Sequence, residues 1–67
     1  MSYLKLFEAI EKENGILTAG DANNEIKVNN VNTNVFNAIV KAVYEYDLNI
    51  LIKPVNQTEL ILIHYDN

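Results

Sequence analysis

The side chains that could carry out catalysis are few and lie far apart along the chain. Nucleophilic catalysis needs a hydroxyl or thiol group beside a base, but the sequence has no cysteine, and its one histidine, His64, is distant from Ser2. We expect His64 to lie partly exposed at the end of a strand. The acidic residues Glu11 and Glu13 fall on different faces of a helix, which separates their carboxylates. The sequence therefore predicts a protein that is not an enzyme.

The sequence also lacks the residues that metal and cofactor sites require. Residues 21–32 begin like a calcium-binding loop, but Ile26 replaces the glycine needed at its sixth position and Asn32 replaces the glutamate at its twelfth. A single histidine without cysteines provides too few ligands for structural zinc. Two glycines in the whole chain cannot form a glycine-rich phosphate loop. We expect neither a metal nor a cofactor.

Length and composition limit the chain to a single small domain, residues 1–67. Of its 67 residues, 49% are hydrophobic, and the formal net charge is -4. The longest apolar run, residues 60–63, is far shorter than the ~20 residues of a membrane-spanning helix. The absence of cysteine and of a secretory signal predicts a cytoplasmic location. Abundant asparagine without arginine is typical of AT-rich coding sequences, such as those of many phages and mobile elements.

Apolar periodicity predicts two helices. Apolar residues recur at helical spacing over residues 3–13, and Gly15 suits the left-handed position that follows a helix. A second helix is expected over residues 33–46, with Thr33 as its N-cap. Because this helix is apolar around most of its circumference, it should be buried over most of it.

Four short segments have the character of strands, and turn-forming residues separate them into two hairpins. The second segment alternates polar and apolar side chains, and the last two are nearly continuously apolar. In the second hairpin we expect Lys53 to pair with Glu59, which places opposite charges across the strands. The four segments are residues 16–19, 25–29, 48–53 and 59–65.

The predicted order of elements is therefore αββαββ, an α+β fold in which two helices pack on a four-stranded antiparallel sheet. A weak internal repeat agrees with this order, because residues 7–12 resemble residues 36–41. The strands of the two halves also begin alike, with Ile16 and Ile50 in one pair and Glu25 and Glu59 in the other. Whether the repeat reflects a duplication stays open.

A winged helix-turn-helix is the alternative fold, with residues 17–26 as a short helix. Four of these ten positions are Gly, Asp or Asn, which are unfavourable in helix interiors. A DNA-binding protein would also need more positive charge. The expected recognition helix carries Lys41 against Glu45, and the chain has no arginine for phosphate or base contacts.

The last hairpin is apolar on both faces, which makes it the most informative segment of the chain. A sheet covered on one side alternates apolar and polar residues, whereas a sheet covered on both sides has continuous apolar strands. Two helices suffice to cover only one face of a four-stranded sheet. We therefore expect the other face to meet another chain, through Leu51, Ile61, Ile63 and Tyr65. The alternative is one helix on each side of the sheet, which would complete a monomeric core.

These observations predict a small acidic protein-binding module that self-associates, with a homodimer as the expected form. The partner is another protein chain: a second copy, or a host protein that a phage or mobile-element accessory protein binds and inhibits. Two alternatives stay open, a winged-helix-like transcriptional regulator that binds DNA and an oligomer that sequesters a small molecule. Nucleic acid is the less favoured partner because the chain is acidic, and no membrane association is expected.

Overall fold

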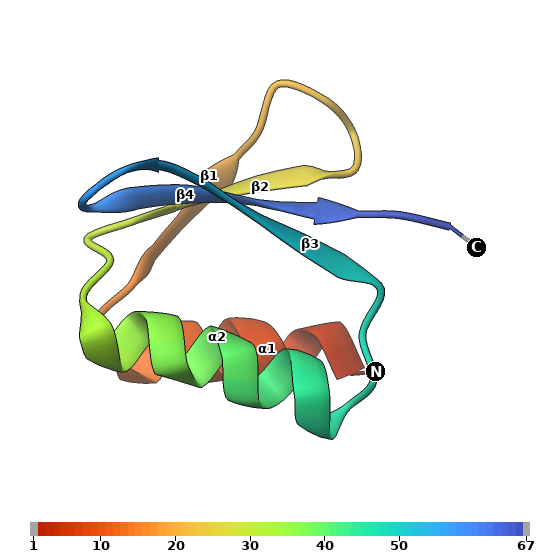
Figure 1. Cartoon of the computed structure of the whole chain (residues 1–67), viewed down its shortest axis with the longest axis horizontal. Helices are drawn as coiled ribbons and strands as arrows, with labels where there is room; N and C mark the ends of the chain where they lie inside the picture. Colours follow the sequence, from red (N-terminus) through yellow and green to blue (C-terminus); the bar gives the residue numbers. More distant parts are fainter. Residues whose placement is uncertain (1, 67) are drawn as a thin grey trace.

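Two helices and four strands follow one another in the predicted αββαββ order (Figure 1). The computed structural model describes residues 2–66. Its strands form one antiparallel sheet in the order β1-β2-β4-β3, which confirms the predicted α+β fold. The elements are α1 (Ser2–Lys12), β1 (Ile16–Ala19), β2 (Glu25–Asn29), α2 (Thr33–Glu45), β3 (Ile50–Asn56) and β4 (Glu59–His64).

The winged helix-turn-helix alternative is wrong, because residues 17–26 belong to the first hairpin and contain no helix. The backbone N–H of Gly20 donates to the Glu25 carbonyl at 3.1 Å and closes the turn between β1 and β2. Turn-forming residues fill the segment between them, as their local backbone preferences favour. These residues therefore form an edge of the sheet and not a third helix.

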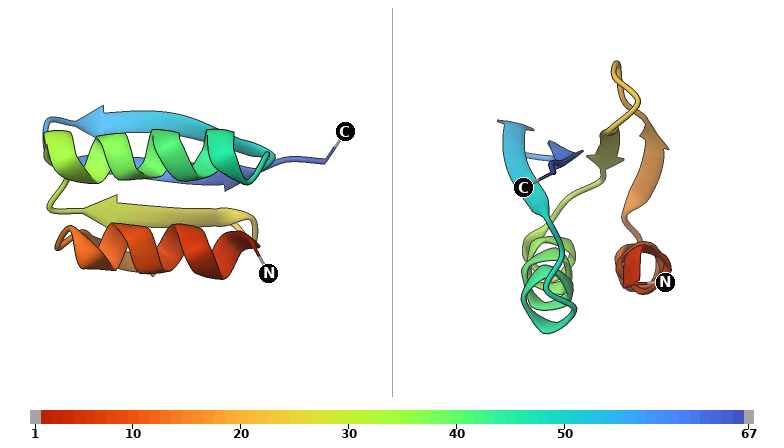
Figure 2. Two further views of the ribbon diagram at one scale, coloured as in Figure 1. Left: turned by 90° about the horizontal axis from the view of Figure 1, so that it is seen from below. Right: turned by 90° about the vertical axis from the view of Figure 1, so that its right-hand side faces the viewer.

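Both helices lie on the same side of the sheet. Figure 1 shows α1 and α2 beneath the strands, and Figure 2 shows the two helices side by side and running in opposite directions. The alternative of one helix on each side of the sheet is therefore wrong. The largest fully buried side chains come from both layers and fill the space between them: Leu6, Ile10, Val28, Val35 and Ile39.

The second helix is less buried than its sequence predicts. Val35, Ile39 and Ala42 face the core, but Phe36 and Tyr44 on its outer flank are 42% and 90% exposed. The expectation of burial around most of its circumference is wrong because only the sheet and α1 cover it, and the remaining side faces solvent. In the described part of the chain, neither helix has the length and apolar character that crossing a membrane requires.

The end of α1 departs from the prediction by one residue. Asn14, and not Gly15, adopts the left-handed backbone conformation, with a φ of 70°, which asparagine tolerates better than most residues. Gly15 is needed for its small size instead. A Cβ atom there would lie 2.6 Å from Ile10 Cγ2 and 3.2 Å from Val35 Cγ1. The missing side chain lets the backbone pass close to both helices as it enters β1.

The second hairpin pairs in a register different from the predicted one. Leu51 lies opposite Ile63 and Lys53 lies opposite Ile61, so the predicted pair of Lys53 with Glu59 is wrong. The observed register differs by two residues. Because side chains alternate between faces with a period of two, every side chain of this hairpin stays on its predicted face.

The turn of this hairpin explains the difference in register. Residues 57–58 alone separate β3 from β4, since the Asn56 side chain stabilises a tight turn by accepting a hydrogen bond from the Thr58 N–H at 2.9 Å. The pairing shifts between Pro54 and Asn56, as at a β-bulge. Pro54 is tolerated within β3 because this strand lies at an edge of the sheet.

The two αββ halves of the chain are related by an approximate two-fold axis perpendicular to the sheet. Exchanging β1 with β3 and β2 with β4 leaves the strand order unchanged, and the central β2–β4 pairing is symmetric about the pair Lys27–Ile61. This geometry supports the interpretation of the sequence as an internal repeat. The fully buried helix residues correspond in pairs, Leu6 with Val35 and Ile10 with Ile39.

Candidate functional site

In the part of the chain that the structure describes, no helix covers the sheet face opposite α1 and α2, here named the open face (Figure 1). Alternate residues of all four strands form it, because successive side chains of a strand point to opposite faces. It consists of Ile16 and Thr18 in β1, Glu25, Lys27 and Asn29 in β2, Leu51 and Lys53 in β3, and Glu59, Ile61 and Ile63 in β4.

The predicted interface residues lie together on and beside the open face. Leu51 lies opposite Ile63 across β3 and β4, and Ile61 is the next residue of β4 on that face. Tyr65 continues the alternation just beyond β4, where its N–H donates to the Asn49 carbonyl at 3.1 Å. Leu51 is 56% exposed and Tyr65 37%, while Ile61 and Ile63 are half-buried. The four side chains therefore form one apolar patch.

Of the charged residues around this patch, Lys53 and Glu59 were expected on this face from the sequence, whereas Glu25 and Lys27 were missed. Lys27 and Lys53 lie on either side of Ile61, while Glu25 lies beside Ile63 and Glu59 is at the start of β4. The open face thus carries two positive and two negative side chains, and its formal charge is zero. The alternation within residues 25–29 was the signal that could have placed Lys27 here.

His64 ends β4 on the helix side of the sheet, where its Nδ1 atom hydrogen-bonds with the Tyr3 hydroxyl. The two rings meet edge to face, with centroids 5.5 Å apart. On the other side of the imidazole, Nε2 lies 3.3 Å from Asp66 Oδ1. The predicted partial exposure of His64 is confirmed, since 42% of its side chain is accessible. Its contact with Tyr3 was missed because 61 positions separate the two residues.

The environment of Tyr3 affects its acidity. Burial raises the pKa of the Tyr3 phenol above its usual value, and the charges of Asp66 and Tyr65 raise it further. Both effects disfavour the phenolate, because an anion loses hydration when buried and is repelled by neighbouring negative charge. Tyr3 therefore stays protonated, and its hydroxyl can donate to His64.

A pocket of about 340 Å³ opens beside these two side chains, between α1 and the sheet. The loop between β1 and β2 forms one wall, and it is held by a pair of hydrogen bonds to the end of β4. The Asn24 side-chain amide donates to the His64 carbonyl, and the His64 N–H donates to the Asn24 carbonyl, both at 2.8 Å. The pocket is lined by Leu6, Phe7, Ile26, Ile50 and Leu62 with the polar residues Tyr3, Asn23, Asn24 and His64.

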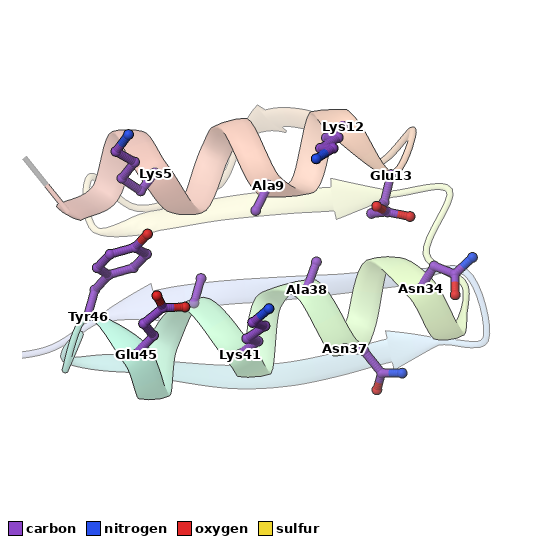
Figure 3. Close-up of a pocket in the computed structure, with 11 residues that line it drawn as sticks. Lys5, Ala9, Lys12, Glu13, Asn34, Asn37, Ala38, Lys41, Glu45 and Tyr46 are labelled. Carbon is purple, nitrogen blue, oxygen red and sulfur yellow. The ribbon is translucent and has the colours of Figure 1, made fainter.

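A second hollow, of about 400 Å³, runs between the two helices on the side away from the sheet (Figure 3). Its floor contains the small residues Ala9 and Ala38, which let the helices approach closely. Its rims carry both signs of charge, so they do not form a site for anions alone. The charged residues are Lys5 and Lys12 from α1, Glu13 directly after it, and Lys41 and Glu45 from α2.

Among the described residues, no group of three or more His, Asp or Glu side chains is placed to hold a metal ion. The fold and its surfaces define a two-layer α+β domain with one uncovered sheet face and a polar-ended pocket between the layers. No protein-family model, curated protein or solved structure matches the chain.

Proposed function

We propose that this chain is a protein-binding module that pairs with a second copy of itself through the open face. The observation that supports this function is the one-sided placement of both helices (Figure 1), which leaves Leu51 and Tyr65 exposed and Ile61 and Ile63 half-buried. An exposed apolar patch with charged residues at its rim is typical of an interaction site. A two-fold axis would bring the same patch of each copy together, as in most homodimers.

Burial of apolar surface favours such a contact. Removing roughly 300 Å² of apolar surface from water on each copy is worth about 15 kcal/mol at about 25 cal/mol per Å². Association costs roughly 4–15 kcal/mol in lost freedom. Two sheets packed face to face bury their facing side chains in one apolar layer. The gain is therefore of the same order as this cost, to which the desolvation of the charged side chains on the face adds.

The distribution of charge favours the open face over other surfaces as the contact between copies. Lys27 and Lys53 balance Glu25 and Glu59 on this face, so the net charge of -4 resides on the rest of the chain. Two copies repel each other through their acidic surfaces but not through the open face. Opposite charges on the two facing sheets can also attract each other across the contact.

The sheet edges are less suitable for association than the open face. The outer edge of β3 carries Lys53 and Pro54 and an irregular pairing near its end. Such features hinder the addition of another strand. At the opposite edge, β1 has only four residues. Contact through faces, with the edges left free, therefore fits this sheet best.

Replacing Leu51 with aspartate tests the proposal. The variant should stay folded by circular dichroism and become monomeric, while the natural chain should have about twice the 7.6 kDa of one copy by light scattering. Leu4→Asp is a matched control, since Leu4 is 58% exposed on α1, similar to Leu51 at 56%. This control should remain a dimer.

Other results would contradict self-association. A natural chain that stays monomeric at millimolar concentration would leave the open face to a different partner, such as a host protein. If Leu4→Asp dissociated the dimer and Leu51→Asp did not, the interface would lie on the helices and not on the open face.

A further inference from the structure

The pocket between α1 and the sheet has the features of a small-molecule site. Its volume of about 340 Å³ falls within the roughly 300–1,000 Å³ of known ligand pockets. Aliphatic side chains and the Phe7 ring form its apolar lining, the loop residues Asn23 and Asn24 form one wall, and the hydrogen-bonded pair of Tyr3 and His64 forms its polar end. No lysine, aspartate or glutamate is among the lining residues that the structure describes. A charged ligand would therefore lose its hydration without gaining a partner.

The hydrogen bonds at the polar end determine what a ligand must offer. Neutral His64 satisfies both of its contacts when Nε2–H donates to Asp66 and Nδ1 accepts from the Tyr3 O–H. The Tyr3 hydroxyl hydrogen is then in use, but its oxygen keeps lone pairs that can accept. The polar end thus presents a hydrogen-bond acceptor, and a matching ligand carries an N–H or O–H donor.

The pseudo-two-fold axis provides an internal comparison. A hollow of about 440 Å³ at the other end of the sheet overlaps the related position, because it includes Phe36 and Leu60, the counterparts of Phe7 and Ile26. In the position of Tyr3 it has Asn32, whose side chain already caps α2. This hollow of about 440 Å³ also includes Glu59. Of the two related positions, only the first combines apolar walls with the Tyr3–His64 pair.

We propose that the pocket lined by Tyr3, Phe7 and His64 binds a small, uncharged aromatic molecule that carries one hydrogen-bond donor. Its ring would pack against Phe7 and the aliphatic walls, where aromatic side chains favour offset or edge-to-face contacts. Its donor would reach the Tyr3 oxygen. The pocket lies on the helix side of the sheet, so this site is independent of pairing through the open face.

Titration with indole and with indene tests the site, because the two molecules have nearly the same shape and only indole has an N–H donor. Nuclear magnetic resonance spectra of the ¹⁵N-labelled chain should show saturable shifts at the amides of Phe7, Ile26 and His64. Indole should bind roughly three- to tenfold more tightly than indene, which is the usual contribution of one hydrogen bond.

Two variants make the experiment specific. Tyr3→Phe keeps the ring and removes the oxygen, so it should abolish the preference for indole and leave the affinity for indene unchanged. Phe36→Ala changes the related hollow and should alter neither affinity. Leu51→Asp should also bind indole normally, so that failure of pairing and failure of the pocket can be told apart.

Three results would overturn the proposal. The first is the absence of saturable shifts with either probe up to its solubility limit. The second is equal affinity for indole and indene, which would mean that the polar end is not used. The third is a set of shifts centred on Phe36 in place of Phe7.

Discussion

Tyr3 and His64 join the two ends of the described chain, one from the first turn of α1 and the other from the last residue of β4. Their hydrogen bond connects the helix layer to the sheet layer at a place where the side chains are half-buried. The same burial raises the pKa of the Tyr3 phenol, with smaller contributions from the charges of Asp66 and Tyr65. Tyr3 thus contributes to the packing of the two layers, and the same packing makes its phenol harder to ionise.

The raised pKa predicts a loss of stability in alkaline solution. In the unfolded chain Tyr3 loses its proton near its ordinary pKa of 10.0, whereas in the folded chain it does so at higher pH. The contribution of Tyr3 is therefore complete below about pH 10, and it is lost as the pH rises through the folded pKa. Urea unfolding between about pH 9 and 11.5 should show the free energy of unfolding decreasing with pH.

Two tyrosine variants isolate this effect. Tyr3→Phe cannot ionise, so its free energy of unfolding should decrease less steeply above pH 10 than that of the natural chain. Tyr44 is 90% exposed, so Tyr44→Phe should leave the slope of the natural chain unchanged. Parallel curves for Tyr3→Phe and the natural chain would show that burial of the phenol does not contribute.

At the scale of elements, the start of α2 depends on a single side chain. Asn32 Oδ1 accepts from the Val35 N–H at 2.9 Å and provides a partner for one of the free donors in the first turn. Val35 is fully buried, so this cap also fixes the helix where it enters the core. The neighbouring Thr33, which the sequence favours as the cap, is already inside the helix.

Replacing Asn32 with alanine should destabilise the fold by about 1 kcal/mol, the usual effect of losing an N-cap. Thr33→Ala is the control, and it should change the free energy of unfolding by less than about 0.5 kcal/mol. Chemical denaturation of both variants measures the difference. If Thr33→Ala lowered the free energy of unfolding more than Asn32→Ala, Thr33 would be the N-cap, as the sequence predicts.

The same reasoning shows which parts of the fold are predictable from sequence. Helix and strand periods are local patterns, so all six elements could be predicted, although the strand expected over residues 48–53 is β3 (Ile50–Asn56) in the structure. The exact ends of the helices are harder to predict. Either Asn32 or Thr33 could cap α2, and either Asn14 or Gly15 could adopt the left-handed conformation. Only the backbone path in the folded chain decides between them. The register of β3 on β4 depends on how tightly the turn after Asn56 closes.

Part of the candidate site could likewise be predicted from the sequence, and part could not. Leu51, Ile61 and Ile63 could be placed on one face because the alternation of strands tolerates an error of two residues in register. The contact of Tyr3 with His64 has no local signal, since it forms only when the first helix docks on the end of the last strand. The pocket beside it is equally a product of docking.

At the scale of the whole molecule, two αββ units are related by an approximate two-fold axis and share one core between two layers. The two-fold relation places the helices of both units on the same side of the sheet (Figure 2). The strands of both units are therefore uncovered on the opposite side. Residues 2–66 form two layers and include no third layer over the open face. Pairing of two copies would provide that layer and give a four-layer arrangement of helices, two sheets and helices.

The neutral charge of the open face leads to a prediction about this pairing. Lys53→Glu changes the formal charge of the face from zero to -2, and in a homodimer two such faces meet. Because like charges that face each other repel at close range, dimerisation should weaken by about fivefold or more in dilute buffer. Sedimentation equilibrium measures the dissociation constant. Salt screens charges, so most of the lost affinity should return at about 0.5 M sodium chloride.

The control for this experiment is Lys41→Glu, which makes the same change of charge on the outer surface of α2. If the open face forms the contact, this variant should dimerise nearly as well as the natural chain, because its new charge lies far from the partner's sheet. Equal weakening in both variants would show that only the total charge of the chain matters. An undiminished Lys53→Glu dimer would show instead that the two copies do not meet at Lys53, and it would exclude the face-to-face arrangement.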